Sequence, residues 1–407
     1  MLYAQRPDSN VDGVAESCMA TLLNTVPDMS ALRSTLAQRN GFDSDTAERL
    51  IYEIVASINL KLFHPISALE LLLVEGCNLA CRYCFESAVL RTRGRGRLMS
   101  NETIRRSIDL LFDYSAPKAS LWITLFGGEP LINFEGVQFA TEYLESKSAA
   151  TGQKYGVGIT TNGVLLTERI VDFLAAHKVR VLLSVDGLAP THDRYRVDRR
   201  GAGTFKRVVS ALRTIKSRQP WVGVKMTVMP SEACNLFANV RGLRDLGANQ
   251  FLIGHASGVQ WPEEAISAYL EQWGLLRDWY REHSRNDVRI NELDEISPRP
   301  PVFGCRAARS GIAVNANGEI TGCSRIATLD GKSRIGKLGD VRSGLYGIGN
   351  RMEMLNCQRL IENCDAVGLA KTYMSGCFAT NYEACGDLYV PNLIEQGISK
   401  RLRQIRI

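Results

Sequence analysis

Three cysteines near residue 80 have a spacing suited to an iron–sulfur centre. Cys77, Cys81 and Cys84 form the pattern C-x3-C-x2-C, which we call the cysteine triplet. Three thiolates can hold three irons of a [4Fe–4S] cube and leave the fourth iron open to another ligand. A structural zinc site needs four ligands in a closed tetrahedron, and the sequence offers no fourth Cys or His nearby. The spacing therefore favours an open-sited cluster over zinc.

Six further cysteines lie in the last quarter of the chain. Asn317-Gly318, between two short apolar runs, predicts a β-hairpin, so the cysteines that bracket it can converge on one metal centre. Six thiolates cannot fully ligate two cubes. They could serve one cluster and leave two cysteines structural, or serve two clusters completed by Asp365, by Asp387 or by substrate. A zinc ribbon is disfavoured because paired CxxC knuckles are absent. The expected ligands are Cys305, Cys323, Cys357, Cys364, Cys377 and Cys385.

Small polar motifs occur further along the chain, each directly after a run of apolar residues. Gly127-Gly128-Glu129 is the first, and backbone carbonyls with the Glu129 carboxylate could accept hydrogen bonds from an ammonium group. Asn162, Ser184 and Asp186 follow later runs and suit a ribose or a carboxylate. Each motif is equally compatible with an ordinary turn or helix cap. His255 follows another such run, where a lone histidine is more often structural.

Alternating strands and helices must position these residues. Six predicted strands alternate with helices along the chain. Such alternation predicts parallel βαβ units with right-handed crossovers. Six units suit an open, partial (β/α)6 barrel of the TIM type, in which chemistry gathers at the carboxyl ends of the strands. The strands are predicted at residues 69–74, 120–126, 156–160, 179–185, 222–228 and 250–253, and the helices at 101–114, 134–149, 167–177, 204–217 and 235–246.

Composition places the chain in the ordinary globular class. Its 407 residues are 45% hydrophobic and 23% charged, which excludes collagen-like, coiled-coil and wholly disordered proteins. No apolar run approaches the roughly 18 residues of a membrane span, and the N-terminus lacks a secretory signal. We therefore expect a cytoplasmic protein with reduced thiols. The net charge of +6 is too weak to indicate nucleic-acid binding.

The cysteine triplet, with Tyr83 before its last cysteine, resembles the motif of the radical S-adenosylmethionine (SAM) superfamily. In that family the open iron of a [4Fe–4S] cluster chelates SAM, and one electron cleaves SAM to a 5′-deoxyadenosyl radical. Gly127, Gly128 and Glu129 resemble the segment that holds the SAM amino group. The resemblance further implies SAM contacts from Ser184 and from Arg196, the latter through the SAM carboxylate. We expect Asn162 and Asp186, as polar side chains after strands, to contact SAM as well.

The chain also resembles the subgroup of radical SAM enzymes that modify peptides. Residues 192–196 and 203–205 are similar to that subgroup, and Cys305 with Gly318 and Cys323 resembles the opening of its SPASM domain. That domain carries two auxiliary iron–sulfur clusters. The later cysteines depart from its usual C-x2-C-x5-C-x3-C run, so one or two auxiliary clusters are expected. Cys18 and Cys234 stand apart and are expected to be ordinary core residues.

The resemblance implies an oxidoreductase that acts on a precursor peptide or protein. Hydrogen abstraction from one residue would lead to a crosslink or another oxidative change in a ribosomally made peptide. One alternative is an anaerobic sulfatase-maturating enzyme that forms formylglycine, and another is an iron–sulfur or zinc protein without turnover. A flavodoxin- or ferredoxin-type electron donor is expected, and a separate leader-binding protein is an option. The basic loop at 91–97 is either solvated or recruits an acidic partner.

The expected layout has five parts, and the Pro-rich stretch at 298–301 suggests the main boundary. A helical segment precedes the partial barrel, a helical linker follows it, and the chain closes with a Cys-rich SPASM-like domain and a basic tail. The respective ranges are 1–64, 65–260, 261–300, 301–390 and 391–407.

Overall fold

A computed structural model describes residues 29–40, 42–84, 96–283, 287–294, 305–329, 336–356, 362–363, 366 and 376–406. Its centre is a mixed, largely parallel sheet of ten strands in the order β10-β9-β8-β1-β2-β3-β4-β5-β6-β7. The strands are β1 (Ala68–Leu72), β2 (Leu121–Phe126), β3 (Tyr155–Thr161), β4 (Arg180–Ser184), β5 (Gly223–Val228), β6 (Gln250–His255), β7 (Arg289–Ile290), β8 (Gly311–Val314), β9 (Glu319–Thr321) and β10 (Lys337–Asp340).

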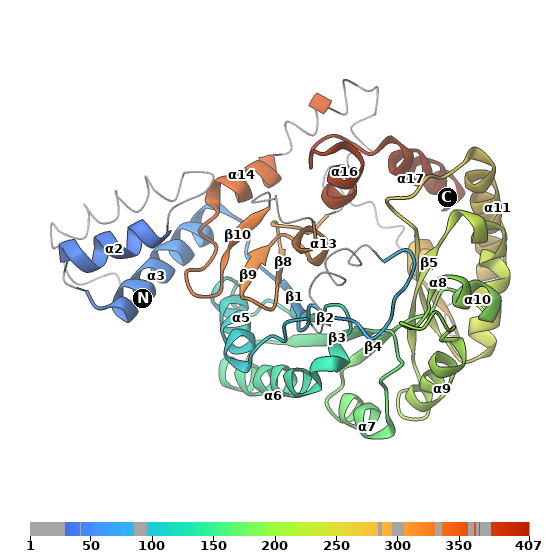
Figure 1. The fold of residues 1–407 in the computed structure, drawn as a ribbon, viewed down its shortest axis with the longest axis horizontal. Helices are drawn as coiled ribbons and strands as arrows, with labels where there is room; N and C mark the ends of the chain where they lie inside the picture. The colour runs from blue at the N-terminus through green and yellow to red at the C-terminus, as the bar shows by residue number, and fades with distance from the viewer. Residues whose placement is uncertain are drawn as a thin grey trace.

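The predicted partial barrel is confirmed. Strands β1 to β6 pair in parallel in chain order, and each lies within two residues of its predicted bounds. Helices cover the outside of this sheet (Figure 1) and likewise match the predicted ranges. They are α5 (Asn101–Asp113), α6 (Phe134–Thr151), α7 (Glu168–Ala176), α9 (Phe205–Lys216) and α10 (Leu236–Asp245), with α11 (Glu263–Glu282) after β6.

Local sequence explains where these helices begin. Ser100, Asn133 and Thr167 each cap a helix by accepting a hydrogen bond from a backbone N–H of its first turn. Such side chains satisfy backbone donors that a helix leaves unpaired. Alternate residues of β2 are buried and half-buried, as expected for a strand with helices on one face and the barrel interior on the other.

The late, Cys-rich region adds strands to the same sheet and does not form a separate one. The predicted hairpin is present as β8 and β9, and Gly318 in its turn has a φ of +88°. Strand β8 pairs in parallel with β1, from Ala68 opposite Gly311 to Leu71 opposite Val314. The sheet therefore extends past the six expected strands on both sides. The Pro-rich stretch at 298–301 lies outside the described residues, and the boundary placed there stays a prediction.

The helices α13 (Ser324–Ala327), α14 (Ile348–Asn356), α16 (Phe378–Cys385) and α17 (Leu393–Arg406) complete the late region. The segment expected as a basic tail is largely α17, which packs against α11 and buries Ile398 and Leu402. In Figure 1, α16 and α17 lie between α13 and α11. One expectation is wrong: Cys234, in the short helix η2 (Pro230–Asn235), is exposed. Cys18 lies outside the described residues.

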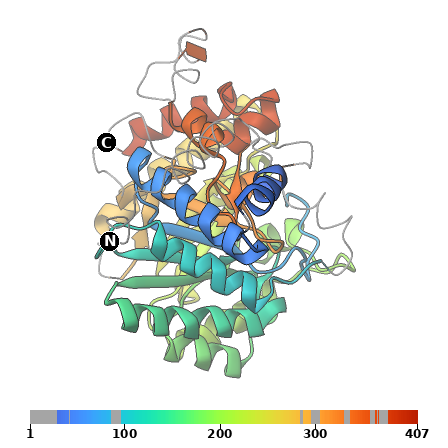
Figure 2. The ribbon, with the colours of Figure 1, turned by 90° about the vertical axis from the view of Figure 1, so that its left-hand side faces the viewer.

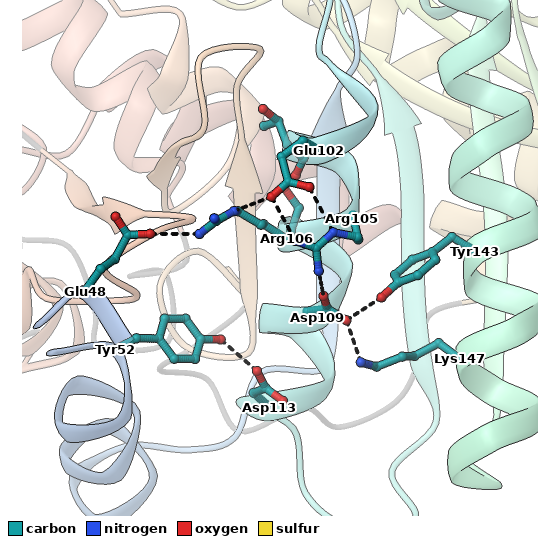
Figure 3. A network of polar contacts seen from close by, with 11 residues as sticks. Glu48, Tyr52, Glu102, Arg105, Arg106, Asp109, Asp113, Tyr143 and Lys147 are labelled. Carbon is teal, nitrogen blue, oxygen red and sulfur yellow. Dashed lines mark hydrogen bonds and ion pairs between the residues drawn. The ribbon is translucent and has the colours of Figure 1, made fainter. Parts of the chain in front are cut away.

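Two N-terminal helices, α2 (Met29–Asn40) and α3 (Ser44–Leu62), lie together on one side of the molecule (Figure 2). Figure 3 shows the polar contacts that join α3 to α5 and α5 to α6. Arg106 of α5 pairs with Glu48 of α3 at 2.9 Å, and Asp109 accepts a hydrogen bond from Tyr143 of α6 at 2.8 Å. These pairs are partly exposed, so each adds little stability, on the order of 0.5 kcal/mol.

Candidate functional site

A cavity of about 430 Å³ opens at the carboxyl ends of the parallel strands. This is the edge at which such barrels hold their chemistry. Most of the residues singled out from the sequence meet there. Its wall includes all three residues of the cysteine triplet and the expected SAM contacts Gly127, Gly128, Glu129, Asn162, Ser184 and Arg196.

The cysteine triplet lies on a loop held by the segment that follows β4. The backbone N–H of Ala80 donates to the carbonyl of Val197, and that of Arg82 to the carbonyl of Tyr195, both at 2.9 Å. Burial raises the pKa of Cys77 to about 12, so its thiol stays protonated until a metal displaces the proton.

The three thiols of this loop suit an iron–sulfur cube. Among the described residues, no three His, Cys, Asp or Glu side chains are arranged to hold one metal ion. A cube binds each cysteine through a different iron, so its thiolates need not meet at one point. Cys77, Cys81 and Cys84 are all half-buried and all face the cavity.

Two glycines let the end of β2 pack against this loop. Gly127 has a φ of +121°, and a Cβ there would lie 2.6 Å from the carbonyl oxygen of Val74. A Cβ on Gly128 would lie 2.3 Å from the carbonyl oxygen of Gly76. Both contacts are too short for any side chain. The two glycines therefore allow a close approach of the protein's own backbone.

Glu129 is fully buried next to this glycine pair. Its carboxylate accepts hydrogen bonds from Thr161 Oγ1 at 2.7 Å, from the Asn162 backbone N–H at 2.8 Å and from the Leu131 backbone N–H at 3.2 Å. Burial nevertheless raises the pKa of Glu129 to about 7. A positively charged ligand beside it would favour the ionised form, as an ammonium group would.

Asn162 links this carboxylate to the cysteine triplet. Its side-chain Nδ2 donates to Asn78 Oδ1 at 2.7 Å and lies 3.8 Å from Cys77 Sγ. The backbone N–H of Leu79 also points at that sulfur, at 3.4 Å. Ser184 lines the same cavity from the end of β4. Its contact with SAM stays a prediction, as do those of the other expected residues.

Asp186 is placed differently from the other expected SAM contacts, because it is absent from the cavity wall. Its Oδ2 accepts hydrogen bonds from the Tyr83 hydroxyl at 2.5 Å and from Arg196 Nε at 2.9 Å. Its Oδ1 accepts from the backbone N–H of Thr227, in β5, at 3.0 Å. Only 3% of Asp186 and 8% of Arg196 is exposed. The structure thus gives Asp186 protein partners on three sides.

His192 supports this arrangement from the helix α8 (Ala189–Tyr195), which the strand and helix patterns missed. The Thr204 hydroxyl donates to the carbonyl of Arg196 at 3.0 Å, so it accepts from His192 Nε2 at 2.9 Å. His192 Nδ1 accepts from the backbone N–H of Asp186 at 3.4 Å. This pattern requires neutral imidazole, and burial lowers the pKa of His192 to about 4.

The cavity wall also contains residues that the sequence analysis missed, among them Lys225, Glu292 and Arg325. His255, left as a lone histidine, lines it too and bonds Glu395 of α17 through Nε2 at 2.5 Å. The sequence carries no local signal for this pair, because its members lie 140 residues apart.

The late cysteines are only partly within the described residues. Burial raises the pKa of Cys323 to about 12, and Glu70, Cys377 and Cys305 are near enough for their charges to raise it further. Cys385 is exposed at the end of α16. Asp387 accepts a hydrogen bond from the backbone N–H of Tyr389 at 2.8 Å. Cys357, Cys364 and Asp365 lie outside the described residues, as do residues 91–95 of the basic loop.

Comparison with known proteins now identifies the barrel. Residues 71–233 match the model of the radical SAM superfamily. The chain contains a radical SAM domain. The matched range contains the cysteine triplet, Glu129, Ser184 and Arg196. Domains of this superfamily hold a [4Fe–4S] cluster and SAM, which fits the thiols and buried polar groups described above. No helix within the described ranges is long and apolar enough to cross a membrane.

The relatives of this radical SAM domain include a cyclopropyl synthase and a sulfatase-maturating enzyme. The chain is 26% identical to the radical SAM cyclopropyl synthase TigE of Paramaledivibacter caminithermalis over 184 aligned residues. The aligned residues cover 43% of this chain and 38% of TigE. It is 32% identical over 143 residues to the serine-type anaerobic sulfatase-maturating enzyme of Bacteroides thetaiotaomicron, covering 34% of each. The chain thus spans about a third of the length of these curated relatives.

A solved structure extends the likeness beyond the radical SAM domain. Streptococcus suis SuiB bound to S-adenosylmethionine superposes with a TM-score of 0.61 at 15% identity, over 93% of this chain and 92% of SuiB. At this identity the likeness concerns the fold alone. It includes the late region as well as the barrel.

Proposed function

We propose that this chain is a radical SAM peptide maturase, which cleaves SAM reductively and abstracts a hydrogen atom from a residue of a ribosomally made peptide. One observation carries the proposal: a single cavity joins the cysteine triplet to Glu129, Asn162, Ser184 and Arg196. A binding module without turnover has no need of an open-sited cluster beside a pocket for a second molecule. A [4Fe–4S] cluster with SAM supplies one-electron chemistry that produces a 5′-deoxyadenosyl radical.

The chain's own residues bind and orient the cofactor in this proposal. Ionised Glu129, or the backbone carbonyls around it, receives the SAM amino group. Arg196 has five N–H donors, so its bond to Asp186 leaves others for the SAM carboxylate. Ser184 and Asn162 face the same space and suit the ribose hydroxyls. The apolar wall formed by Phe126, Met226 and other residues excludes water from the radical.

A peptide substrate is the second part of the proposal. SuiB, whose fold this chain shares, has also been solved bound to the precursor peptide SuiA. After hydrogen abstraction the substrate radical must lose one electron; Cys305, Cys323 and Cys377 would help to hold an auxiliary iron–sulfur centre, which would supply an acceptor for that electron. A crosslink or another oxidative change then forms with release of a proton. A flavodoxin- or ferredoxin-type donor supplies the first electron, and leader binding by a separate protein remains an option.

Formylglycine formation is the second candidate. It is favoured by the 32% identity to the serine-type sulfatase-maturating enzyme. In that reaction a Ser or Cys side chain of the substrate becomes an aldehyde. A crosslink and a Ser-derived aldehyde both remove two hydrogens, so mass alone does not separate the two functions. Capture by a hydrazide probe does, because it labels only the aldehyde.

The test begins with SAM alone. After anaerobic reconstitution and reduction by dithionite, the wild-type protein should form 5′-deoxyadenosine, and the Cys81→Ala variant should form none. Peptides encoded beside the gene are then added and examined by mass spectrometry with hydrazide capture. A reconstituted wild-type protein that forms no 5′-deoxyadenosine contradicts the proposal. A modified small molecule with unmodified peptides contradicts the peptide assignment.

A further inference from the structure

We propose that four exposed arginines beside the cysteine triplet form the docking surface for an acidic protein that donates one electron to the cluster. The inference rests on the proposed function, since it requires a [4Fe–4S] cluster on the triplet, and it adds the place where the electron donor binds. We call these residues the arginine patch: Arg82, Arg97, Arg199 and Arg200.

Backbone hydrogen bonds tie Arg82 and Arg97 to the loop of the triplet. Arg82 is itself a residue of this loop, and its backbone N–H donates to the carbonyl of Tyr195 at 2.9 Å. The carbonyl of Arg97 accepts from the backbone N–H of Glu75 at 2.9 Å, and Glu75 lies two residues before Cys77. Both arginines are exposed, so they bring positive charge to the surface next to the triplet.

Arg199 and Arg200 reach the same loop from a tight turn. The turn is closed by the backbone N–H of Asp198, which donates to the carbonyl of Ala202 at 2.8 Å. Arg199 is exposed, yet its Nη2 donates to the carbonyl oxygen of Cys77 at 2.7 Å. This bond joins the protein surface to the backbone of an expected cluster ligand. An electron that arrives at this surface therefore has a short path to the cluster.

The positive charge of the arginine patch is not balanced by carboxylates. Within the ranges that the structure describes, none of its four guanidinium groups takes part in an ion pair. Arg105, by contrast, is exposed on α5 and pairs with Glu102 at 2.8 Å. Asp198, inside the tight turn, pairs with Arg207 at 3.1 Å. Four unbalanced cations around one loop favour a negatively charged partner.

The position of the arginine patch favours an electron donor over the peptide substrate. None of its four residues lines the cavity at the strand ends, whereas all three triplet cysteines do. A peptide has to enter that cavity, but an electron donor has only to come close to the cluster. Leu98, next to Arg97, is 50% exposed and pairs with Val74. An apolar side chain among polar ones is typical of protein interfaces.

The step at this surface is the transfer of one electron. A flavodoxin-type donor gives up the electron from its reduced flavin, and a ferredoxin-type donor from its reduced iron–sulfur centre. The electron takes the cluster on the triplet from its 2+ to its 1+ state, and no other atom passes between the two proteins.

The experiment compares protein donors with dithionite, a small reductant that needs no docking surface. A purified flavodoxin and a purified ferredoxin, both acidic and fully reduced, are the protein probes for the reconstituted full-length chain with SAM. Arg97→Gln/Arg200→Gln removes two charges and leaves the bond from Arg199 to Cys77 in place. At low salt and limiting donor it should slow 5′-deoxyadenosine formation roughly tenfold. Saturating dithionite should drive this variant at the wild-type rate.

Binding is measured separately from activity. The oxidised, reconstituted protein without SAM is titrated into dye-labelled flavodoxin or ferredoxin, and fluorescence anisotropy gives the Kd. Arg97→Gln/Arg200→Gln should raise the Kd roughly tenfold at low salt, and added salt should weaken wild-type binding and shrink this difference. Arg97→Lys/Arg200→Lys keeps both charges and should bind nearly as well as wild type.

Lys154→Gln/Arg213→Gln is the matched control, because it removes the same net charge at the opposite edge of the barrel. Both residues are exposed; Lys154 directly precedes β3, and Arg213 lies in the last turn of α9. This variant should bind both donors as wild type does.

Four results overturn the inference and leave the proposed function intact. They are wild-type binding of neither donor, unchanged binding in Arg97→Gln/Arg200→Gln, an equal loss of binding in the control variant, and a patch variant whose only defect is peptide modification under dithionite. The last result would assign the arginine patch to the peptide. A wild-type protein that forms no 5′-deoxyadenosine with dithionite overturns the proposed function and, with it, the inference.

Discussion

Acid should destabilise this protein through His192, and the His192→Gln variant should remove that sensitivity. His192 is fully buried, and its neutral form is fixed at both ring nitrogens. Protonation at Nδ1 would set a new N–H against the backbone N–H of Asp186, so the charged form loses a hydrogen bond and gains a repulsion. A glutamine side chain can reach Thr204 and has no titrating proton in this range.

The magnitude follows from the pKa of His192. It lies near 4 in the folded protein, against an ordinary value of 6.5 for the unfolded chain. Between these values the unfolded chain binds a proton that the folded protein does not, so the free energy of unfolding falls as pH falls. The loss amounts to about 3 kcal/mol between pH 6.5 and 4, at 1.36 kcal/mol per pH unit. Above pH 6.5 the contribution is fully present.

The assay is anaerobic urea unfolding followed by tryptophan fluorescence, at a series of pH values for wild type and variant. The difference in unfolding free energy between them should shrink by about 3 kcal/mol from pH 6.5 to 4. Glu129→Gln serves as a control of opposite sign. Because burial raises the pKa of Glu129 to about 7, the folded protein binds the extra proton, and wild-type stability falls as pH rises from 4.5 to 7. The reasoning would be refuted if the difference in unfolding free energy between wild type and His192→Gln stayed constant with pH, or grew as the pH fell.

Four further outcomes are expected. Cys77→Ala, Cys81→Ala and Cys84→Ala should each abolish 5′-deoxyadenosine formation, measured by chromatography, because the cube then lacks a protein thiolate. Joint replacement of Cys305 and Cys323 by Ala should lower iron content and modified peptide while some 5′-deoxyadenosine still forms; a folded variant with wild-type peptide modification would exclude a catalytic auxiliary centre. Arg351→Met should cost about 3 kcal/mol in urea unfolding, because Arg351 is buried and donates to Asn59 and to the carbonyls of His64 and Ala308. Arg106→Gln, at a partly exposed pair, should cost under about 1 kcal/mol.

Local patterns predicted most of the barrel. Apolar runs and helical periodicity were enough to place six strands and five helices, because each element buries one side that repeats at a fixed spacing. Asn317-Gly318 predicted the hairpin for a similar reason, since its turn needs the positive φ that Gly318 adopts. These features depend on neighbours in the sequence.

What the sequence could not predict depends on residues far apart in the chain. Nothing near Gly311 shows that β8 pairs with β1, and nothing near His255 indicates Glu395. We expected Asp186 beside SAM because it follows a strand. The direction in which its carboxylate points depends on its hydrogen bond to Tyr83, which lies 103 residues earlier in the chain. The helix α8 was missed because its seven residues are too few to show a clear apolar period.

The pairing of β8 with β1 has a consequence for how the chain is made. Strand β1, which precedes the cysteine triplet, has one edge that is completed by Gly311–Val314, about 240 residues downstream. During synthesis at about 5–20 residues per second, that edge stays unpaired for roughly 12 to 50 seconds after β1 has left the ribosome. An unpaired edge invites pairing with another nascent chain. Yields of the full-length protein should therefore depend on chaperones and on translation speed more than its folded stability would suggest.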